Sequence, residues 1–243
     1  MNSFKPIPET LVETRLALHR LATYVIAPAR YRVTERFGLR ATKGGFGTPE
    51  FEGRRIRVEG LNLIDERNGE EKVSQITTLS AASEFLDEPV DGETAAEHDS
   101  PEIGDLNEDL AIDEATSLWL GDWFNAAFAG LSAVGADAES VDASAPQLWP
   151  GHFDPAIEVG DEPHRGSYGA SPGDHNIAEP YLYLGIWSPD GLDIDLEDGF
   201  WNASAFKGAL MKVSDFPRDE DPVEVAASFW RTTRDRLNAA SVI

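Results

Sequence analysis

Three of the five histidines fall in one stretch of the chain, together with carboxylates and tyrosines. This stretch, residues 149–183, contains seven side chains of types that bind ligands: His152, Asp154, Tyr168, Ser171, Asp174, Glu179 and Tyr181. Imidazole and carboxylate groups bind metal ions and transfer protons, while hydroxyl groups orient a bound molecule. We therefore expect residues 149–183 to build a polar pocket.

A divalent metal is the cofactor that this set would bind. If residues 152–154 are extended, the side chains of His152 and Asp154 project to the same face and form a pair of ligands. Asp174 follows a glycine and supplies a third ligand; one imidazole and two carboxylates suit zinc, manganese or non-haem iron. The spacing matches no metal signature such as His-Glu-x-x-His. Residues 171–174, Ser-Pro-Gly-Asp, also form a good tight turn in their own right.

Two other kinds of chemistry are disfavoured by the sequence. Residues 169–173 have the letters of a serine-nucleophile motif, but Pro172 lacks the N–H that the oxyanion hole requires. The glycine-rich residues 44–47 lack the Lys-Ser/Thr pair of a phosphate-binding loop. Gly169 and Gly173 instead suggest that the backbone approaches a ligand closely. The chain has no cysteine, which excludes disulfides and thiolate metal sites.

The amino-acid composition limits the classes of binding partner and the cellular location that we expect for this protein. A net charge of −24 repels phosphate backbones and anionic lipids, so we expect no nucleic-acid partner and no membrane partner. Hydrophobic residues make up 41% of the 243 residues, which is enough for a core, and no apolar run approaches a membrane span. The first six residues lack the apolar stretch of a signal peptide. These features together predict a cytoplasmic protein.

Residues 87–114 differ from the rest of the chain. They contain twelve Asp or Glu and no Lys or Arg, with prolines and glycines between them. This composition predicts a flexible acidic insertion that packs little and tolerates replacement by a short linker. A calcium loop is disfavoured, because no Asp-x-Asp-x-Asp-Gly array is present. An adaptor function through this segment is one of the alternatives for the whole protein.

Hydrophobic periodicity predicts an α+β fold. We expect helices over 8–27, 79–86, 113–134 and 222–240, and strands over 37–77 and 145–216. The expected architecture is antiparallel sheets covered by long helices, in a single compact domain over 1–243. Each half has a strand block followed by an aromatic-rich helix, which suggests two pseudo-repeated halves. The predicted core includes Trp123, Phe128, Phe229 and Trp230.

Parts of the sequence resemble a block in an uncharacterised bacterial family, which reads His-Phe-Asp, then Phe-Gly-Phe, then Gly-Asp, then Glu-Pro. The residues that carry the resemblance are Trp149–Asp154, Ser167–Gly169, Gly173–Asp174 and Glu179–Tyr183, with a looser likeness at Gly38–Thr42 and Ile76–Leu79. The chain is also similar to actinobacterial proteins of unknown function that share Gly-Gly-Phe-Gly-Thr-Pro, here residues 44–49. Where the family often has a second histidine, this chain has Gly151. The resemblance implies no activity.

Three functions compete on this basis. The leading hypothesis is a non-catalytic protein that binds a small molecule or an ion in the pocket of residues 149–183. The first alternative is a metal-assisted hydrolase or isomerase that uses His152, Asp154 and Asp174. The second is an interaction protein that uses the acidic segment. The sequence indicates neither the ligand nor the oligomeric state.

Overall fold

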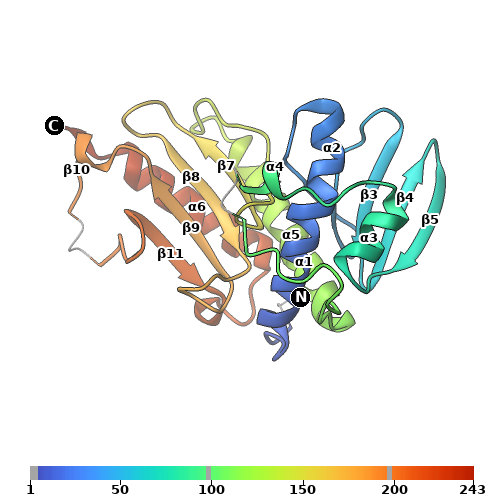
Figure 1. Cartoon of the computed structure of the whole chain (residues 1–243). Coiled ribbons are helices and arrows are strands. Elements are labelled where there is room, and N and C mark those ends of the chain that lie inside the picture. The colour runs from blue at the N-terminus through green and yellow to red at the C-terminus, as the bar shows by residue number, and fades with distance from the viewer. Residues whose placement is uncertain (1–4, 97–99, 196–198) are drawn as a thin grey trace. The chain divides into compact units, whose positions relative to one another are not determined.

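The computed structural model describes residues 5–96, 100–195 and 199–243. Helices and antiparallel strands are both abundant, so the protein has the α+β fold that the sequence predicts (Figure 1). Contacts divide the chain into two compact units where the sequence predicts one domain. The N-terminal unit comprises Pro6–Asn125 and Leu148–Asp154. The C-terminal unit comprises Ala126–Gln147 and Pro155–Ile243.

The N-terminal unit begins with a long helix in three parts: α1 (Leu11–Leu21), the π-helical η1 (Ala22–Ile26) and α2 (Ala27–Thr34). The prediction that this helix ends at Pro28, because proline has no N–H for the carbonyl four residues back, is wrong. The carbonyl in question is that of Tyr24, and it accepts a hydrogen bond from the N–H of Asp91 (3.0 Å). Another segment thus replaces the missing donor, and the helix continues.

Three further helices contribute to this unit: α3 (Leu79–Leu86), α4 (Gly92–Ala96) and the first half of α5 (Glu114–Gly135). Thr78 caps α3, because its Oγ1 accepts a hydrogen bond from the N–H of Ala81 (3.0 Å). Asp113 caps α5 through the N–H of Thr116 (2.9 Å). These caps fix the boundaries that the sequence predicts for both helices.

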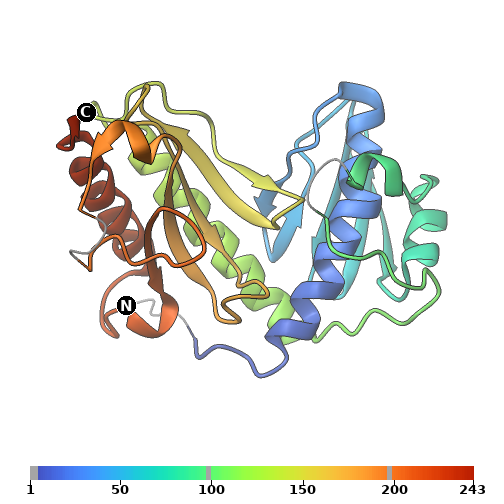
Figure 2. The same ribbon diagram turned by 60° about the vertical axis from the view of Figure 1, so that its left-hand side comes forward.

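The sheet of the N-terminal unit is a meander of five antiparallel strands: β1 (Arg40–Thr42), β2 (Gly45–Gly47), β3 (Arg54–Glu59), β4 (Asn62–Arg67) and β5 (Glu70–Gln75). Asn68 and Gly69 both have positive φ, 53° and 85°, as a tight two-residue hairpin requires. One face buries apolar side chains such as Ile56, while the other carries ion pairs such as Arg55–Glu66 (3.3 Å). Figure 2 shows α1, η1 and α2 running alongside this sheet.

The glycine-rich residues 44–49 have a structural role in this unit. Helix α5 lies so close to β2 that a Cβ atom at Gly121 would be 2.5 Å from the backbone N of Gly45. Beside this contact, Phe46 meets Phe124 edge to face at 6.3 Å. The glycines therefore allow a helix and a strand to approach each other closely.

The acidic segment makes contacts that correct the expectation of a segment that packs little. The N–H of Leu110 donates to the carbonyl of Thr77 (2.7 Å), and Leu110 itself is buried. Nε of Arg20 donates to the carbonyl of Ile103 (2.7 Å), and the hydroxyl of Tyr24 donates to the carbonyl of Pro101. The segment is anchored because its backbone carbonyls find donors on α1 and η1, which composition does not reveal.

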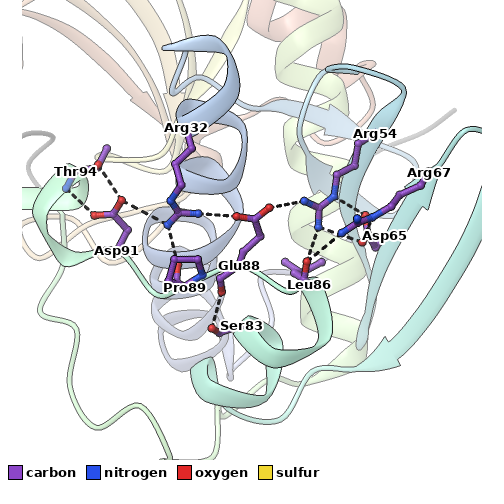
Figure 3. Close-up of polar contacts among 10 residues, drawn as sticks. All are labelled: Arg32, Arg54, Asp65, Arg67, Ser83, Leu86, Glu88, Pro89, Asp91 and Thr94. Carbon is purple, nitrogen blue, oxygen red and sulfur yellow. Dashed lines mark hydrogen bonds and ion pairs between the residues drawn. The ribbon is translucent and has the colours of Figure 1, made fainter.

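Two carboxylates of the acidic segment belong to an ionic network at one end of the same sheet (Figure 3). Asp65, buried on β4, accepts hydrogen bonds from Nε and Nη2 of Arg54 at 2.8 and 3.1 Å. Glu88 lies between Nη1 of Arg54 (2.5 Å) and Nη1 of Arg32 (2.7 Å). Arg32 also reaches Asp91 at 3.5 Å. The network therefore joins α2, β3 and β4 to the start of the acidic segment.

The second five-stranded antiparallel sheet has the order β11-β9-β8-β7-β6 and belongs to the C-terminal unit, except for Leu148 and Trp149 of β6 and Asp154 of β7. Its strands are β6 (Gln147–Trp149), β7 (Asp154–Val159), β8 (Gly166–Ser171), β9 (Tyr181–Ile186) and β11 (Gly208–Lys212). A separate pair joins β10 (Leu192–Asp193) to β12 (Ser241–Val242), and short 3-10 turns cover η2 (Pro189–Gly191) and η3 (Val213–Asp215). The apolar run 180–187 becomes the interior strand β9, as its two apolar faces predict.

Helix α6 (Pro222–Asn238) packs against this sheet, and the indole N–H of Trp230 donates to the carbonyl of Tyr183 (3.2 Å). The helix begins as predicted, because Oδ1 of Asp221 accepts a hydrogen bond from the N–H of Val223 (2.9 Å). The second half of α5 meets α6 at Gly130, where a Cβ atom would lie 2.9 Å from the ring of Trp230.

The predicted core aromatics divide into two groups. Trp123 and Trp230 are fully buried, as expected, whereas Phe128 and Phe229 are only half-buried. The structure has two antiparallel sheets of five strands each, but a pseudo-repeat of the two halves stays a prediction. Within residues 5–96, 100–195 and 199–243, no helix combines the length and apolar character that crossing a membrane requires.

Candidate functional site

The histidine motif lies in a turn of the N-terminal unit and not in a strand. The N–H of Phe153 donates to the carbonyl of Trp149 (2.7 Å), and Phe153 has a left-handed backbone conformation with φ of 57°. The premise of an extended segment is therefore wrong, because the chain turns between His152 and Asp154. His152 is exposed, whereas Asp154 is buried at the start of β7. These two side chains therefore do not project from one face of a single strand.

The side chain of Phe153 explains why this conformation is held. A left-handed conformation costs a residue other than glycine about 1–2 kcal/mol. The ring of Phe153 is completely buried and meets Phe46 and Phe124 edge to face at 5.0 and 5.1 Å. Burial of a large aromatic side chain offsets a cost of that size. In this unit the phenylalanine of the His-Phe-Asp motif is a core residue.

His19 on α1 holds the turn in place. Its Nε2 lies 2.7 Å from the carbonyl oxygen of Pro150 and 2.9 Å from that of Gly151. Because both partners are acceptors, Nε2 carries a proton. The imidazole also stacks on the ring of Phe153, with centroids 5.2 Å apart. Burial lowers the pKa of His19 to about 4, against the opposing effect of the two carbonyl partners, so the ring is neutral at pH 7.

Sequence reasoning missed His19, because a single histidine within a helix looks like a surface residue. The turn gives Pro150 and Gly151 a structural role: their carbonyls accept hydrogen bonds from His19, and that of Pro150 accepts another from the hydroxyl of Thr23 (2.8 Å). The segment around the His-Phe-Asp motif, the most distinctive part of the sequence, thus forms a turn that is hydrogen-bonded to the first long helix of this unit.

Four of the predicted binding residues gather at one end of the C-terminal unit's sheet: Ser171, Asp174, Glu179 and Tyr181. Ser171 and Tyr181 are paired across β8 and β9. The hydroxyl of Tyr181 donates to Oδ2 of Asp174 (2.5 Å). Oε1 of Glu179 lies 3.4 Å from Nζ of Lys212, which is paired with Tyr181 across β9 and β11.

The cluster is explained by the loop between β8 and β9, which Asp174 stabilises through hydrogen bonds. Oδ1 of Asp174 also accepts hydrogen bonds from the N–H groups of Asn176 (2.6 Å) and Ile177 (2.9 Å). Burial raises the pKa of Asp174, but the hydrogen bonds from Tyr181 and from these two N–H groups outweigh burial and hold the pKa below its ordinary value. A carboxylate that caps its own loop is typical of a tight turn.

Tyr168 lies apart from that cluster. Side chains alternate between the faces of a strand, so Tyr168 and Ser171 on β8 point to opposite sides of the sheet. Tyr168 is 1% exposed, and its burial raises the pKa of the hydroxyl. Tyr168 therefore belongs to the core and not to the wall of a pocket with Ser171.

Gly169 and Gly173 serve the packing and the turns of the protein itself. A Cβ atom at Gly169 would lie 2.4 Å from the ring of Tyr183, so Gly169 makes room for that ring. Gly173 has φ of 94°, a conformation that favours glycine in a turn. Both glycines therefore have a role that requires no ligand, and the approach of a ligand to them stays a prediction.

The metal hypothesis gains no support from the structure. His152 and Asp154 belong to the N-terminal unit, and Asp174 belongs to the C-terminal unit. Among the residues that the structure describes, no group of three or more His, Asp or Glu could hold a metal ion. The metal set of His152, Asp154 and Asp174 stays a prediction.

A cavity of about 350 Å³ lies in the C-terminal unit between β11 and α6. Its apolar lining includes Phe200, Leu210, Met211, Pro217, Val225 and Phe229. Its polar lining comes from Asn202, Glu220, Ser228, Thr232 and Thr233. The half-buried state of Phe229 follows from this position, because part of its ring faces the cavity.

The edge of the sheet shapes this cavity. Strand β11 is an edge strand, and the side chain of Asn202 pairs with it in place of a further strand. Oδ1 of Asn202 accepts from the N–H of Leu210 (2.8 Å), and Nδ2 donates to the carbonyl of the same residue (3.1 Å). Sequence reasoning missed the cavity, although Val225 and Phe229 stand four residues apart on α6, and Ser228 and Thr232 repeat that spacing.

Comparison with known proteins adds no family to this description. No protein-family model, no curated protein and no solved structure matches the chain.

Proposed function

We propose that this protein binds a small, largely apolar molecule, without transforming it, in the cavity between β11 and α6. The proposal keeps the class of function that the sequence favours and moves the site away from residues 149–183. The observation that supports it is the cavity itself. Its volume of about 350 Å³ falls within the range of roughly 300–1,000 Å³ that is typical of small-molecule pockets.

The lining suits an apolar ligand. At roughly 30 Å³ per water molecule in the liquid, the volume corresponds to about a dozen waters. Transfer of apolar ligand surface from water to this lining is favourable by about 25 cal/mol per Å². The hydroxyls of Ser228 and Thr232 and the amide of Asn202 offer a few polar contacts that would orient the ligand.

Binding fits this lining better than catalysis does. Glu220 is the one ionisable side chain among the lining residues. General acid–base catalysis, nucleophilic attack and metal-assisted hydrolysis each rely on further groups beside a single carboxylate. The proposal is therefore a carrier, sensor or storage role.

Titration calorimetry with 1-naphthylmethanol, a neutral aromatic probe, tests the proposal. Ser228 and Thr232 are exposed residues that line the cavity, so Ser228→Trp and Thr232→Trp should fill it without disturbing the core. We expect saturable binding of the probe to the native protein and at least a tenfold loss of affinity in both variants.

The matched control is Asn238→Trp, which adds the same ring at an exposed position of α6 outside the lining. This variant should bind the probe as the native protein does. If the native protein does not bind the probe saturably, or if Ser228→Trp and Thr232→Trp bind it unchanged, the proposed function is wrong.

A further inference from the structure

The charge around the cavity has a predominant sign. Glu220 lines the cavity, and residues 218–224 around it contain Asp219, Asp221 and Glu224 against a single basic residue, Arg218. No basic side chain lines the cavity. Among residues 5–96, 100–195 and 199–243, no ion pair involves Glu220. The charged group that a ligand meets in this cavity is therefore a carboxylate.

We propose that the ligand of this cavity is an organic cation: an apolar body that carries an amine or a similar positive group placed against Glu220. This inference rests on the proposed function and names the chemical class of its ligand. The apolar body fills the space between β11 and α6, where Leu210, Val225 and Phe229 contribute to the lining. The positive group donates hydrogen bonds to the carboxylate of Glu220 and to the hydroxyl oxygens of Ser228 and Thr232.

Helix α6 does not offer an anion site beside the cavity. The start of a helix normally attracts anions, because its first N–H groups are unpaired. Here Asp221 caps the helix, with its Oδ1 2.9 Å from the N–H of Val223, and Glu224 adds a negative charge in the first turn. The carboxylates of Asp221 and Glu224 already occupy or surround this helix end, so they would repel an anionic ligand.

The aromatic lining is compatible with a positive charge. The guanidinium of Arg236 already lies over the ring of Phe200, with its carbon 4.0 Å from the ring centroid. Phe200 lines the cavity, whereas Arg236 does not. Arg236 thus covers one face of the Phe200 ring, and Phe229 is the lining ring that a ligand cation would meet.

A matched series of probes tests the inference: 1-naphthylmethylammonium, 1-naphthylmethanol and 1-naphthoate, which share one ring system and differ in charge. For the native protein in 0.15 M salt, we expect the cation to bind about threefold to fivefold more tightly than the neutral alcohol, which is the ratio that an exposed ion pair provides. The anion should bind more weakly than the alcohol. The preference should shrink in 1 M salt.

Two variants separate Glu220 from the general negative charge of the protein. Glu220→Gln should bring the affinities of the cation and the alcohol together, while binding of the alcohol persists. Glu224→Gln removes the same charge outside the lining and should keep the preference for the cation.

Three outcomes contradict the inference or its basis. Equal binding of the cation and the alcohol by the native protein overturns the inference and leaves the proposed function intact. If Glu224→Gln abolishes the preference for the cation as fully as Glu220→Gln does, the inference is also overturned. The preference would then come from the net negative charge of the protein and not from Glu220. Failure of every probe to bind overturns the proposed function itself.

Discussion

Stability in mild acid should depend on the half-buried imidazole of His19, which packs on Phe153 and the carbonyls of Pro150 and Gly151. The pKa of His19 is lowered by burial to about 4 in the folded protein, from 6.5 in the unfolded chain. The unfolded chain therefore binds a proton that the folded protein excludes. The contribution of His19 to stability is complete above pH 6.5 and is lost as the pH falls from 6.5 toward 4.

The size of this effect follows from the two pKa values. Proton linkage gives a loss of about 2 kcal/mol in the free energy of unfolding between pH 7 and pH 4.5. Carboxylates add little in this interval, because those with shifted pKa values lose their contribution at lower pH. These are Asp91, Asp113, Asp137 and Asp174, each with a pKa held below its ordinary value.

Urea unfolding followed by circular dichroism at pH 7.0 and pH 4.5 measures the effect. The variant His19→Gln keeps a side-chain N–H donor that can serve the carbonyls of Pro150 and Gly151, but it has no titrating group. We expect the native protein to lose about 2 kcal/mol more than His19→Gln over this interval. The matched control is His175→Gln, which removes an exposed imidazole and should lose as much as the native protein. If His19→Gln keeps the full pH dependence, the assignment of a half-buried neutral imidazole is refuted.

Three other perturbations test the fold. Asp65→Asn should cost about 1.5–3 kcal/mol in urea unfolding, because it removes the charge of a buried carboxylate that accepts hydrogen bonds from Arg54, while Arg54 keeps its ion pair with Glu88. Glu66→Gln, on the solvent face of β4, should cost at most about 1 kcal/mol, and equal costs would contradict the role of the network. Gly169→Ala should cost about 1–3 kcal/mol, because the new Cβ atom meets the ring of Tyr183, and an unchanged melting temperature would refute that contact. Replacement of residues 87–114 by a short Gly/Ser linker should cost about 3 kcal/mol, since several anchoring hydrogen bonds are lost; no change in the unfolding midpoint would restore the expectation of a loose segment.

Much of the fold could be predicted from local signals in the sequence. The Asp221-Pro222 start of α6, the extent of α5 and the apolar run of β9 were readable because caps and periodicity act over a few neighbouring residues. The same local reasoning ended the first helix too early. At Pro28 the helix continues, and Asp91, far along the chain, supplies the donor that the proline lacks.

The candidate site was harder to predict, for a physical reason. Side-chain types in residues 149–183 suggested ligands, yet the partners of Pro150 and Gly151 are on α1, more than 130 residues earlier in the chain. These contacts involve backbone carbonyls, which every residue has and no sequence pattern marks. The cavity beside α6 is defined by space that side chains leave unfilled. Such space depends on the arrangement of whole elements.

Because residues 148–154 belong to the N-terminal unit, that unit cannot complete its folding during translation until they have been synthesised. Leu148 exchanges both backbone hydrogen bonds with Leu39, and Phe153 completes the aromatic core around Phe46 and Phe124. At translation rates of about 5–20 residues per second, this closing segment is synthesised about 1.5–6 seconds after residue 125. During that interval the nascent chain exposes an unfinished apolar surface, which is the kind of surface that chaperones recognise.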